Sequence, residues 1–184
     1  MMNARERPAD LRRRWLVASL AAVGLLAALS ARAGAQEPIF VIDWSKTTPA
    51  SSRVVGDGVE ITADTRGGTF PLATIQPPDL GRIGYAIRGQ VRYSDVVGQG
   101  YLEMWNVSVD GQRFFSRTLA GSGAGAALTG SSEWRAFELP FFLQGAAPPS
   151  RLEINVVLPG TGMVTVGRLN LVRLDEVAAG GMSA

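Results

Sequence analysis

The side chains best suited to chemistry in this sequence are arginines, amides and aromatic rings, in a chain with no histidine and no cysteine. Without histidine, the usual general base, the commonest zinc ligand and the Ser-His-Asp triad are all missing. Saccharides are bound by flat aromatic rings that stack on sugar C–H groups, together with planar polar side chains that hydrogen-bond hydroxyls. The composition therefore favours binding over catalysis.

Eight residues are candidates for a ligand-binding surface. Residues 83–94 alternate strictly, which indicates a strand with one buried and one polar face. We expect this polar face to lie beside one face of a hairpin and beside a later strand, as a ligand-binding surface or as a solvated outer sheet face. Trp134 follows a turn, where it either stacks on a sugar or plugs the end of the fold. The candidates are Arg88, Gln90, Arg92, Asn106, Phe115, Arg117, Trp134 and Asn155.

The hairpin is predicted over residues 101–119, YLEMWNVSVDGQRFFSRTL. Asp110-Gly111 is typical of a two-residue type I′ turn, which needs positive φ at both central residues. This turn would pair Val109 with Gln112, Val107 with Phe114, Trp105 with Ser116 and Glu103 with Thr118. The more apolar face, expected in the core, carries Tyr101, Trp105, Val107, Val109 and Phe114, and the opposite face Met104, Asn106, Phe115 and Arg117. Glu103 on the core face would need an arginine partner.

Further strand candidates follow one another with short turns and no helix-period segment. They cover residues 39–43, 54–55, 59–63, 72–75, 134–142, 151–158 and 164–174, with a loop over 120–132. We expect a turn at Gly56-Asp57-Gly58, a bulge at Gly167, and an edge position or bulge at Pro140. This pattern predicts an all-β fold, a jelly-roll-like two-sheet antiparallel sandwich, with a lipocalin-type β-barrel as the alternative.

The first 35 residues have the anatomy of a secretory signal peptide. Arginines at 5, 7 and 12–14 precede an uncharged apolar run at 15–29, and Ala33-Gly34-Ala35 supplies a cleavage pattern. The run is short for a membrane span, although an uncleaved anchor is the alternative, and Arg12-Arg13-Arg14 also fits a twin-arginine signal. We expect a periplasmic or secreted protein, with membrane contact only through an uncleaved leader. Residues 36–176 would form the domain and 177–184 a flexible tail.

Charge and length constrain the expected domain further. Of the 18 Lys and Arg residues six lie in 1–35, as do two of the 16 acidic residues, so residues 36–184 carry a formal charge of −2. The pI of about 9.5 therefore belongs to the leader and gives no support for nucleic-acid binding. A domain of this length forms a sufficient core without disulfides.

Residues 83–174 resemble the galactose-binding-like β-sandwich group, which includes many carbohydrate-binding modules. The resemblance is carried by residues 85–91, which contain Gly89-Gln90-Val91, and by residues 128–141, which contain the run GSSEWRAF. Residues 152–156 and 162–171 add to it. It implies a jelly roll, usually non-catalytic, that often binds a saccharide on a concave face or in end loops. Members of this group often hold one structural calcium ion, for which Glu37, Asp43, Asp175 and Glu176 are the acidic candidates near the domain ends.

The function expected from these features is an exported, non-catalytic module that binds carbohydrate or cell-envelope glycan. A periplasmic or surface module that docks another protein is the alternative. A glycan-active enzyme is the third hypothesis, and it would need two facing carboxylates such as Glu103 with Glu138 or Glu153. Phosphate-loop and dinucleotide fingerprints are missing from the sequence, so no cofactor is expected beyond a structural calcium.

Overall fold

The computed structural model describes residues 36–174, except 47, 81 and 145–146. The expected leader, its cleavage site and the expected tail at 177–184 lie outside these residues. The strands are β1 (Phe40–Ile42), β2 (Arg53–Val55), β3 (Gly58–Ala63), β4 (Gly68–Ile75), β5 (Gly84–Val107), β6 (Arg113–Arg117), β7 (Leu128–Phe142), β8 (Arg151–Leu158), β9 (Gly162–Val166) and β10 (Leu169–Arg173), with a 3₁₀ turn η1 (Gly123–Gly125). No helix in this part of the chain is long and apolar enough to cross a membrane.

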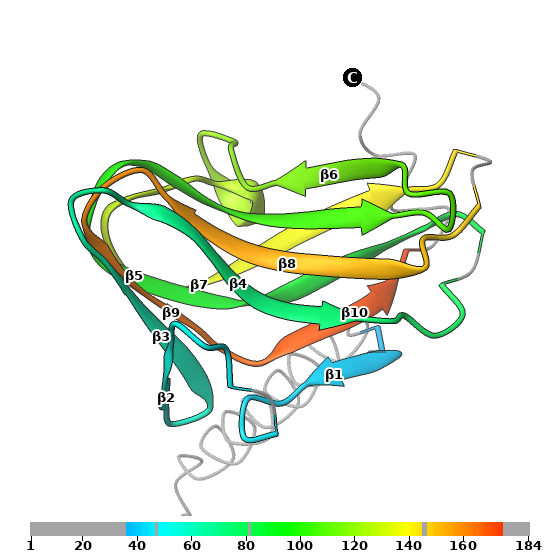
Figure 1. Ribbon diagram of the computed structural model, residues 1–184, viewed down its shortest axis with the longest axis horizontal. Coiled ribbons are helices and arrows are strands. Elements are labelled where there is room, and N and C mark those ends of the chain that lie inside the picture. The colour runs from blue at the N-terminus through cyan, green and yellow to red at the C-terminus, as the bar shows by residue number, and fades with distance from the viewer. Residues whose placement is uncertain (1–35, 47, 81, 145–146, 175–184) are drawn as a thin grey trace, which may run out of the picture. The chain divides into compact units, whose positions relative to one another are not determined.

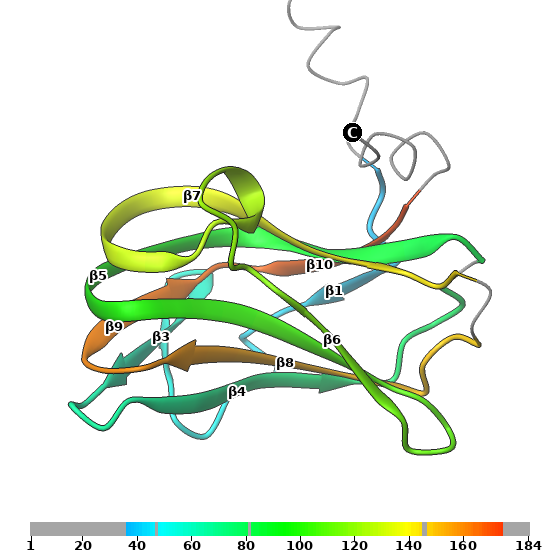
Figure 2. The same cartoon turned by 90° about the horizontal axis from the view of Figure 1, so that it is seen from above.

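Strand β5 organises the domain because it belongs to two sheets. In sheet A its first half pairs with β7 on one side and with β10 and β9 on the other, while β1 pairs with β10, β3 with β9 and β2 with β3. In sheet B its second half pairs with β6 and β8, and β8 pairs with β4. Every one of these pairings is antiparallel. Figure 1 shows β5, in green, passing at one end from one layer into the other, and Figure 2 shows the layers from above.

The two layers form an open sandwich. Within the described chain, β1, β2, β4, β6 and β7 each pair with a neighbour on one side only, so the sheets do not close into a barrel. The predicted jelly-roll-like antiparallel sandwich is confirmed, and the lipocalin-type alternative is wrong. The edge position predicted for Pro140 is also confirmed, since β7 pairs only with β5 in the part of the chain that the structure describes.

The bend in β5 was not predicted, because residues 83–94 and 101–107 were expected as separate strands. The pairing with β7 shifts three times between Val91 and Gly100. Gly98 has φ +82, a left-handed conformation that favours glycine, and Asp95 has φ +54. A Cβ at Gly100 would lie 2.8 Å from Leu158 Cδ2 and 3.1 Å from the Val157 carbonyl oxygen, so a larger residue here would require these groups to shift. The shifts change which alternate residues point inward.

Inward-facing side chains of both sheets form one core. In the first half of β5 the odd-numbered Tyr85, Ile87 and Val91 are buried, whereas in the second half the even-numbered Leu102 and Met104 are. They pack with apolar side chains of β3, β8, β9 and β10. Burial of these apolar side chains provides the main favourable contribution to the free energy of folding.

The N-terminal segment and the β9–β10 connection meet at Gly167. Trp44 is 1% exposed and donates its indole Nε1–H to the Gly167 carbonyl at 2.9 Å. The Gly167 N–H donates in turn to the Gln90 carbonyl at 2.9 Å. Gly167 was predicted as a bulge within one strand, but it lies in the two-residue break that separates β9 from β10. The loop predicted over 120–132 is shorter than expected, because β7 begins at Leu128.

The register predicted for the β5–β6 hairpin is wrong by one residue. Val107 pairs with Arg113, Trp105 with Phe115 and Glu103 with Arg117. The connection spans residues 108–112, in which the Ser108 N–H donates to the Gln112 carbonyl at 2.9 Å and the Asp110 carboxylate accepts from the Gln112 N–H at 3.2 Å. Only Gly111 of the central pair has positive φ, so a type I′ turn does not form. A shift of one residue moves Phe115 and Arg117 onto the face of Trp105 and Glu103.

Candidate functional site

The bend of β5 distributes the predicted site residues over two sheets. Arg88, Gln90 and Arg92 lie on the outer face of sheet A, where Arg92 contacts Trp134. Phe115, Arg117 and Asn155 lie on the outer face of sheet B, in rows with Trp105 and Glu103. The single surface expected from the sequence is therefore wrong, because β5 changes sheet and its alternation shifts at the bend.

Asn106 is buried and does not lie on the same surface as the other predicted site residues. It is 1% exposed, its Oδ1 accepts from the Tyr85 hydroxyl at 2.7 Å, and its Nδ2 donates to the Phe114 carbonyl at 3.2 Å. Burial also raises the pKa of Tyr85 well above its ordinary value, because the phenolate would lose its hydration. Asn106 is thus a satisfied, buried residue that ties the two halves of β5 together, and its predicted binding role stays a prediction.

An open pocket of about 510 Å³ lies on the outer face of sheet A, and we call it the Trp134 pocket. It gathers side chains from β5, β7 and β10, the β2–β3 turn and the β9–β10 break. Its lining residues are Val55, Asp57, Gly58, Arg88, Gly89, Gln90, Trp134, Gly167, Arg168 and Asn170. Three of the eight predicted site residues, Arg88, Gln90 and Trp134, are among them.

Sheet register positions the polar groups of this pocket. Arg88 on β5 is paired with Asn170 on β10 and with Glu138 on β7. Its Nη2 lies 3.2 Å from the Glu138 carboxylate, and both side chains remain about one-third exposed. The Arg88 guanidinium is therefore oriented by Glu138 and still accessible from the pocket. Gly167 carries no side chain into this space. A Cβ at this position would lie 3.6 Å from the Trp134 ring and would occupy part of the pocket.

The remaining groups of the pocket are open to a ligand. Trp134 is 43% exposed, and the Arg92 guanidinium lies 5.1 Å from its ring centroid, an arrangement that fixes the ring through a cation–π contact. The side chains of Gln90, Asn170 and Arg168 form no hydrogen bond with other described residues. An accessible aromatic ring thus lies beside two amides, two guanidinium groups and the Asp57 carboxylate.

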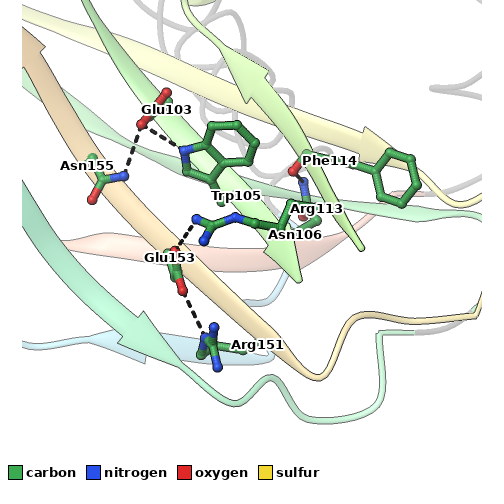
Figure 3. A network of polar contacts seen from close by, with 8 residues as sticks. All are labelled: Glu103, Trp105, Asn106, Arg113, Phe114, Arg151, Glu153 and Asn155. Atoms are coloured by element: carbon green, nitrogen blue, oxygen red, sulfur yellow. Dashed lines mark hydrogen bonds and ion pairs between the residues drawn. The ribbon is translucent and has the colours of Figure 1, made fainter. Parts of the chain in front are cut away.

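The outer face of sheet B holds three more of the predicted residues, Phe115, Arg117 and Asn155. The expected arginine partner of Glu103 is Arg117, whose Nε lies 3.0 Å from the Glu103 Oε2. Phe115 packs edge-to-face on Trp105 with ring centroids 5.3 Å apart. Trp105 was assigned to the core from the sequence, but it lies on this outer face. Figure 3 shows it beside Glu103 and Asn155.

One signal in the sequence could have identified the outer face of the hairpin, although Glu103 was expected on the core face. Glu103 alternates with Leu102 and Met104, and a buried face without charge is cheaper to form than one with a carboxylate. Asp57, Arg168 and Asn170 had no such signal, because their place in the Trp134 pocket depends on pairing between strands distant in sequence.

The calcium hypothesis stays a prediction. The Asp43 carboxylate accepts hydrogen bonds from the hydroxyl and N–H of Ser45, which lower its pKa. Asp175 and Glu176 lie outside the described residues. Among the residues described, no three acidic side chains converge in a group that could hold a metal ion.

These features define the class of the protein as an antiparallel jelly-roll-like β-sandwich with an open polar and aromatic pocket on one sheet. No protein-family model matches the chain, and no curated protein matches it. The solved structures that it is similar to include the Family 16 Carbohydrate Binding Module-2, at 8% identity and a TM-score of 0.44, over 68% of this chain and 82% of that one.

Two further solved structures show the range of similar proteins. A module named BiXyn10A CBM1 matches at 15% identity and a TM-score of 0.45, over 75% of this chain and 99% of that one. A chain of infectious bursal disease virus, Gt strain, matches at 13% identity and a TM-score of 0.48, over 73% of this chain. This chain spans only 32% of the length of that viral chain. At these levels the similarities assign no function.

Proposed function

We propose that this protein is an exported, non-catalytic module that binds a saccharide in the Trp134 pocket, with cell-envelope glycan as its natural ligand. The observation that carries the proposal is the exposed Trp134 ring beside the Gln90 and Asn170 amides, which form no hydrogen bond with other described residues, in one open pocket. The residues directly involved would be Arg88, Gln90, Trp134 and Asn170.

The chemistry of the pocket fits a polyhydroxylated ring. Trp134 supplies a flat apolar surface, while Gln90 and Asn170 each offer both a donor and an acceptor in one plane. Its volume of about 510 Å³ lies within the usual range for small-ligand pockets, roughly 300–1,000 Å³. Mixed donors and acceptors around one aromatic ring suit hydroxyl groups better than an extended apolar ligand.

Binding without hydrolysis is supported by the acidic groups of the two faces. Asp57 is the one carboxylate among the residues that line the pocket, whereas glycosidases generally use two facing carboxylates. Glu103 accepts hydrogen bonds from Trp105, Asn155 and Arg117, and Glu138 is paired with Arg88 on the other sheet. Glu103 and Glu138 thus do not share a face. Glu103 and Glu153 do share the outer face of sheet B, but hydrogen bonds from Trp105, Asn155 and Arg117 engage the first carboxylate and those from Arg113 and Arg151 engage the second. Hydrolysis of a bound glycan that disappears in Glu103→Gln would contradict this proposal.

The test is a glycan screen followed by titration calorimetry with the protein and its Trp134→Ala variant. We expect Trp134→Ala to weaken binding at least about tenfold, which corresponds to ~1.4 kcal/mol. Phe114→Ala is the matched control, because Phe114 is an exposed aromatic residue outside the pocket, 47% exposed against 43% for Trp134. Equal binding by wild type and Trp134→Ala, with both proteins folded, would exclude the Trp134 pocket as the saccharide-binding site.

Protein docking is the second candidate function. Large apolar side chains are exposed along the β5–β6 hairpin and just beyond it: Val109 is 90% exposed, Phe115 53% and Leu119 43%. Such side chains are typical of protein contact surfaces when they gather. Co-purification of one protein partner that soluble glycans do not displace, and that Val109→Ser abolishes, would favour this function over saccharide binding.

Export rests on the sequence of residues 1–35. We expect the mature chain to begin at Gln36, and mass spectrometry of the intact protein from the native compartment measures this directly. A mature chain that retains the apolar run at 15–29 would indicate an anchored protein instead.

A further inference from the structure

A second set of ligand-type side chains lies on the outer face of sheet B, and we call it the Trp105 platform. Strand register places Arg117, Glu103 and Asn155 in one row across β6, β5 and β8, and Phe115, Trp105 and Glu153 in the next. Tyr101, Arg113 and Arg151 complete the platform. Sheets A and B pack face to face, so this platform and the Trp134 pocket lie on opposite sides of the sandwich.

The centre of the platform is held rigid by Glu103. Its carboxylate is only 5% exposed and accepts three hydrogen bonds, from Trp105 Nε1 at 2.9 Å, Asn155 Nδ2 at 3.0 Å and Arg117 Nε at 3.0 Å. A buried carboxylate with three donors is satisfied, so it orients its neighbours. The Trp105 ring and the Arg117 guanidinium are therefore fixed before any ligand arrives.

Glu153 orders the other two arginines. Arg113 Nη2 donates to Glu153 Oε2 at 2.6 Å, and Arg151 Nε donates to Glu153 Oε1 at 2.9 Å. Figure 3 shows Glu153 between these two guanidinium groups, which reach it from β6 and from β8. Glu153 thus holds two arginine side chains, each about half exposed, next to the Trp105 ring.

The arginines keep capacity for a ligand. Arg117, Arg113 and Arg151 each engage a carboxylate through a single nitrogen, and their other N–H groups form no hydrogen bond with described residues. The Arg117 guanidinium carbon lies 4.2 Å from the Phe115 ring centroid. The Arg113 guanidinium carbon lies 4.9 Å from the Trp105 ring centroid. Three arginines face two glutamates, which leaves one net positive charge on the platform.

We propose that the Trp105 platform is a second binding site, specific for a saccharide that carries a carboxylate. The exposed Phe115 ring provides the stacking surface, and the free guanidinium N–H groups of Arg113 and Arg151 bind the carboxylate, for which a planar fork is well matched. A neutral sugar would leave the surplus positive charge uncompensated. This site does not depend on the Trp134 pocket, and one domain could hold two glycan segments on opposite faces.

The experiment compares trigalacturonic acid with the neutral α-1,4-linked galactotriose, two trisaccharides of the same linkage that differ in their carboxylates, by titration calorimetry. Trp134→Ala serves as the parent protein, so that the platform is measured without the pocket. We expect the acidic trisaccharide to bind more tightly, and its affinity to fall when NaCl is raised. Arg113→Gln or Arg151→Gln, each introduced into this parent protein, should weaken binding of the acidic trisaccharide about tenfold, since a charge-assisted hydrogen bond is lost.

The choice of variants keeps the fold intact. Glu153 retains one arginine partner in either single variant, and melting curves check this. Arg66→Gln is the charge-matched control, because Arg66 is paired with Asp64 in an exposed turn away from the platform. The proposal is overturned if galactotriose binds the parent protein as tightly as the acid, or if Arg113→Gln and Arg151→Gln both bind like Arg66→Gln. Loss of neutral-sugar binding in Trp134→Ala concerns the pocket alone.

Discussion

Replacement of Glu103 by glutamine tests whether the row across β6, β5 and β8 is held by one carboxylate. Glutamine has the same shape, but it offers one acceptor oxygen where the carboxylate has two. In the native protein Oε1 accepts from Trp105 and Asn155, and Oε2 accepts from Arg117. The amide oxygen of glutamine would keep the first two hydrogen bonds, and its NH₂ group would face the Arg117 guanidinium as a second donor.

The expected loss of unfolding free energy in Glu103→Gln follows from the hydrogen bond to Arg117 that is lost. A hydrogen bond to a charged group contributes about 1.5–3 kcal/mol to stability. The Arg117 side chain is 28% exposed and regains part of its hydration, which reduces the expected loss in unfolding free energy to about 1–2 kcal/mol. For a domain of this length that corresponds to a decrease in Tm of roughly 3–8 °C.

The assay is thermal and urea unfolding followed by circular dichroism. Glu133→Gln is the matched control, because Glu133 is an exposed glutamate on β7 with no ion pair among the described residues. A double-mutant cycle with Arg117→Met isolates the pair, and we expect a coupling of about 1 kcal/mol. If Glu103→Gln is as stable as Glu133→Gln, or if the coupling is near zero, the carboxylate does not organise this row.

Three further predictions concern the core, the bend and the pocket. Tyr85→Phe should cost about 1–3 kcal/mol, because the buried Asn106 Oδ1 loses its donor. Since burial raises the pKa of Tyr85, the wild type should lose stability as the pH rises above about 10, the ordinary tyrosine value. Tyr85→Phe should lack this loss. Parallel curves of unfolding free energy against alkaline pH for the two proteins would contradict the prediction. Gly98→Ala should destabilise by about 1–3 kcal/mol in urea unfolding, because φ is +82 and the new Cβ would lie 2.8 Å from Pro159 Cγ, while an unchanged midpoint would refute the strain. Trp134→Phe should retain part of the saccharide affinity that Trp134→Ala loses, as measured by calorimetry, and identical losses would argue against stacking.

Most of the secondary structure could be predicted from local pattern. The alternation through Tyr85, Ile87 and Val91 correctly indicates the buried face of the first half of β5, and the same holds for Leu152, Ile154 and Val156 on β8. Period-2 alternation is a local property, because successive side chains of a strand point to opposite faces whatever the strand pairs with. The all-β class and the sandwich follow from the number and length of such segments.

The position of the site residues depended on pairing between distant segments. Asp110-Gly111 correctly marks the β5–β6 turn, but its five-residue connection in place of two moved Phe115 onto the opposite face. A one-residue shift exchanges the two faces of a strand, and the local sequence on either side of the turn is compatible with both registers. The predicted pairing of Glu103 with an arginine was confirmed because the cost of an unpaired buried carboxylate does not depend on register.

By itself, the sequence determined that this domain is built from alternating strands around an apolar core, and that arginines, amides and aromatic rings occupy its outer faces. The tertiary structure alone decided which of these residues meet. The bend between Val91 and Gly100 carries β5 from one sheet into the other, so Arg88 and Gln90 join Trp134 while Trp105 joins Phe115 and Arg117. The physical reason is that a bend and a register are set by contacts across the whole sandwich, such as that between Gly100 and Leu158, which no local pattern contains.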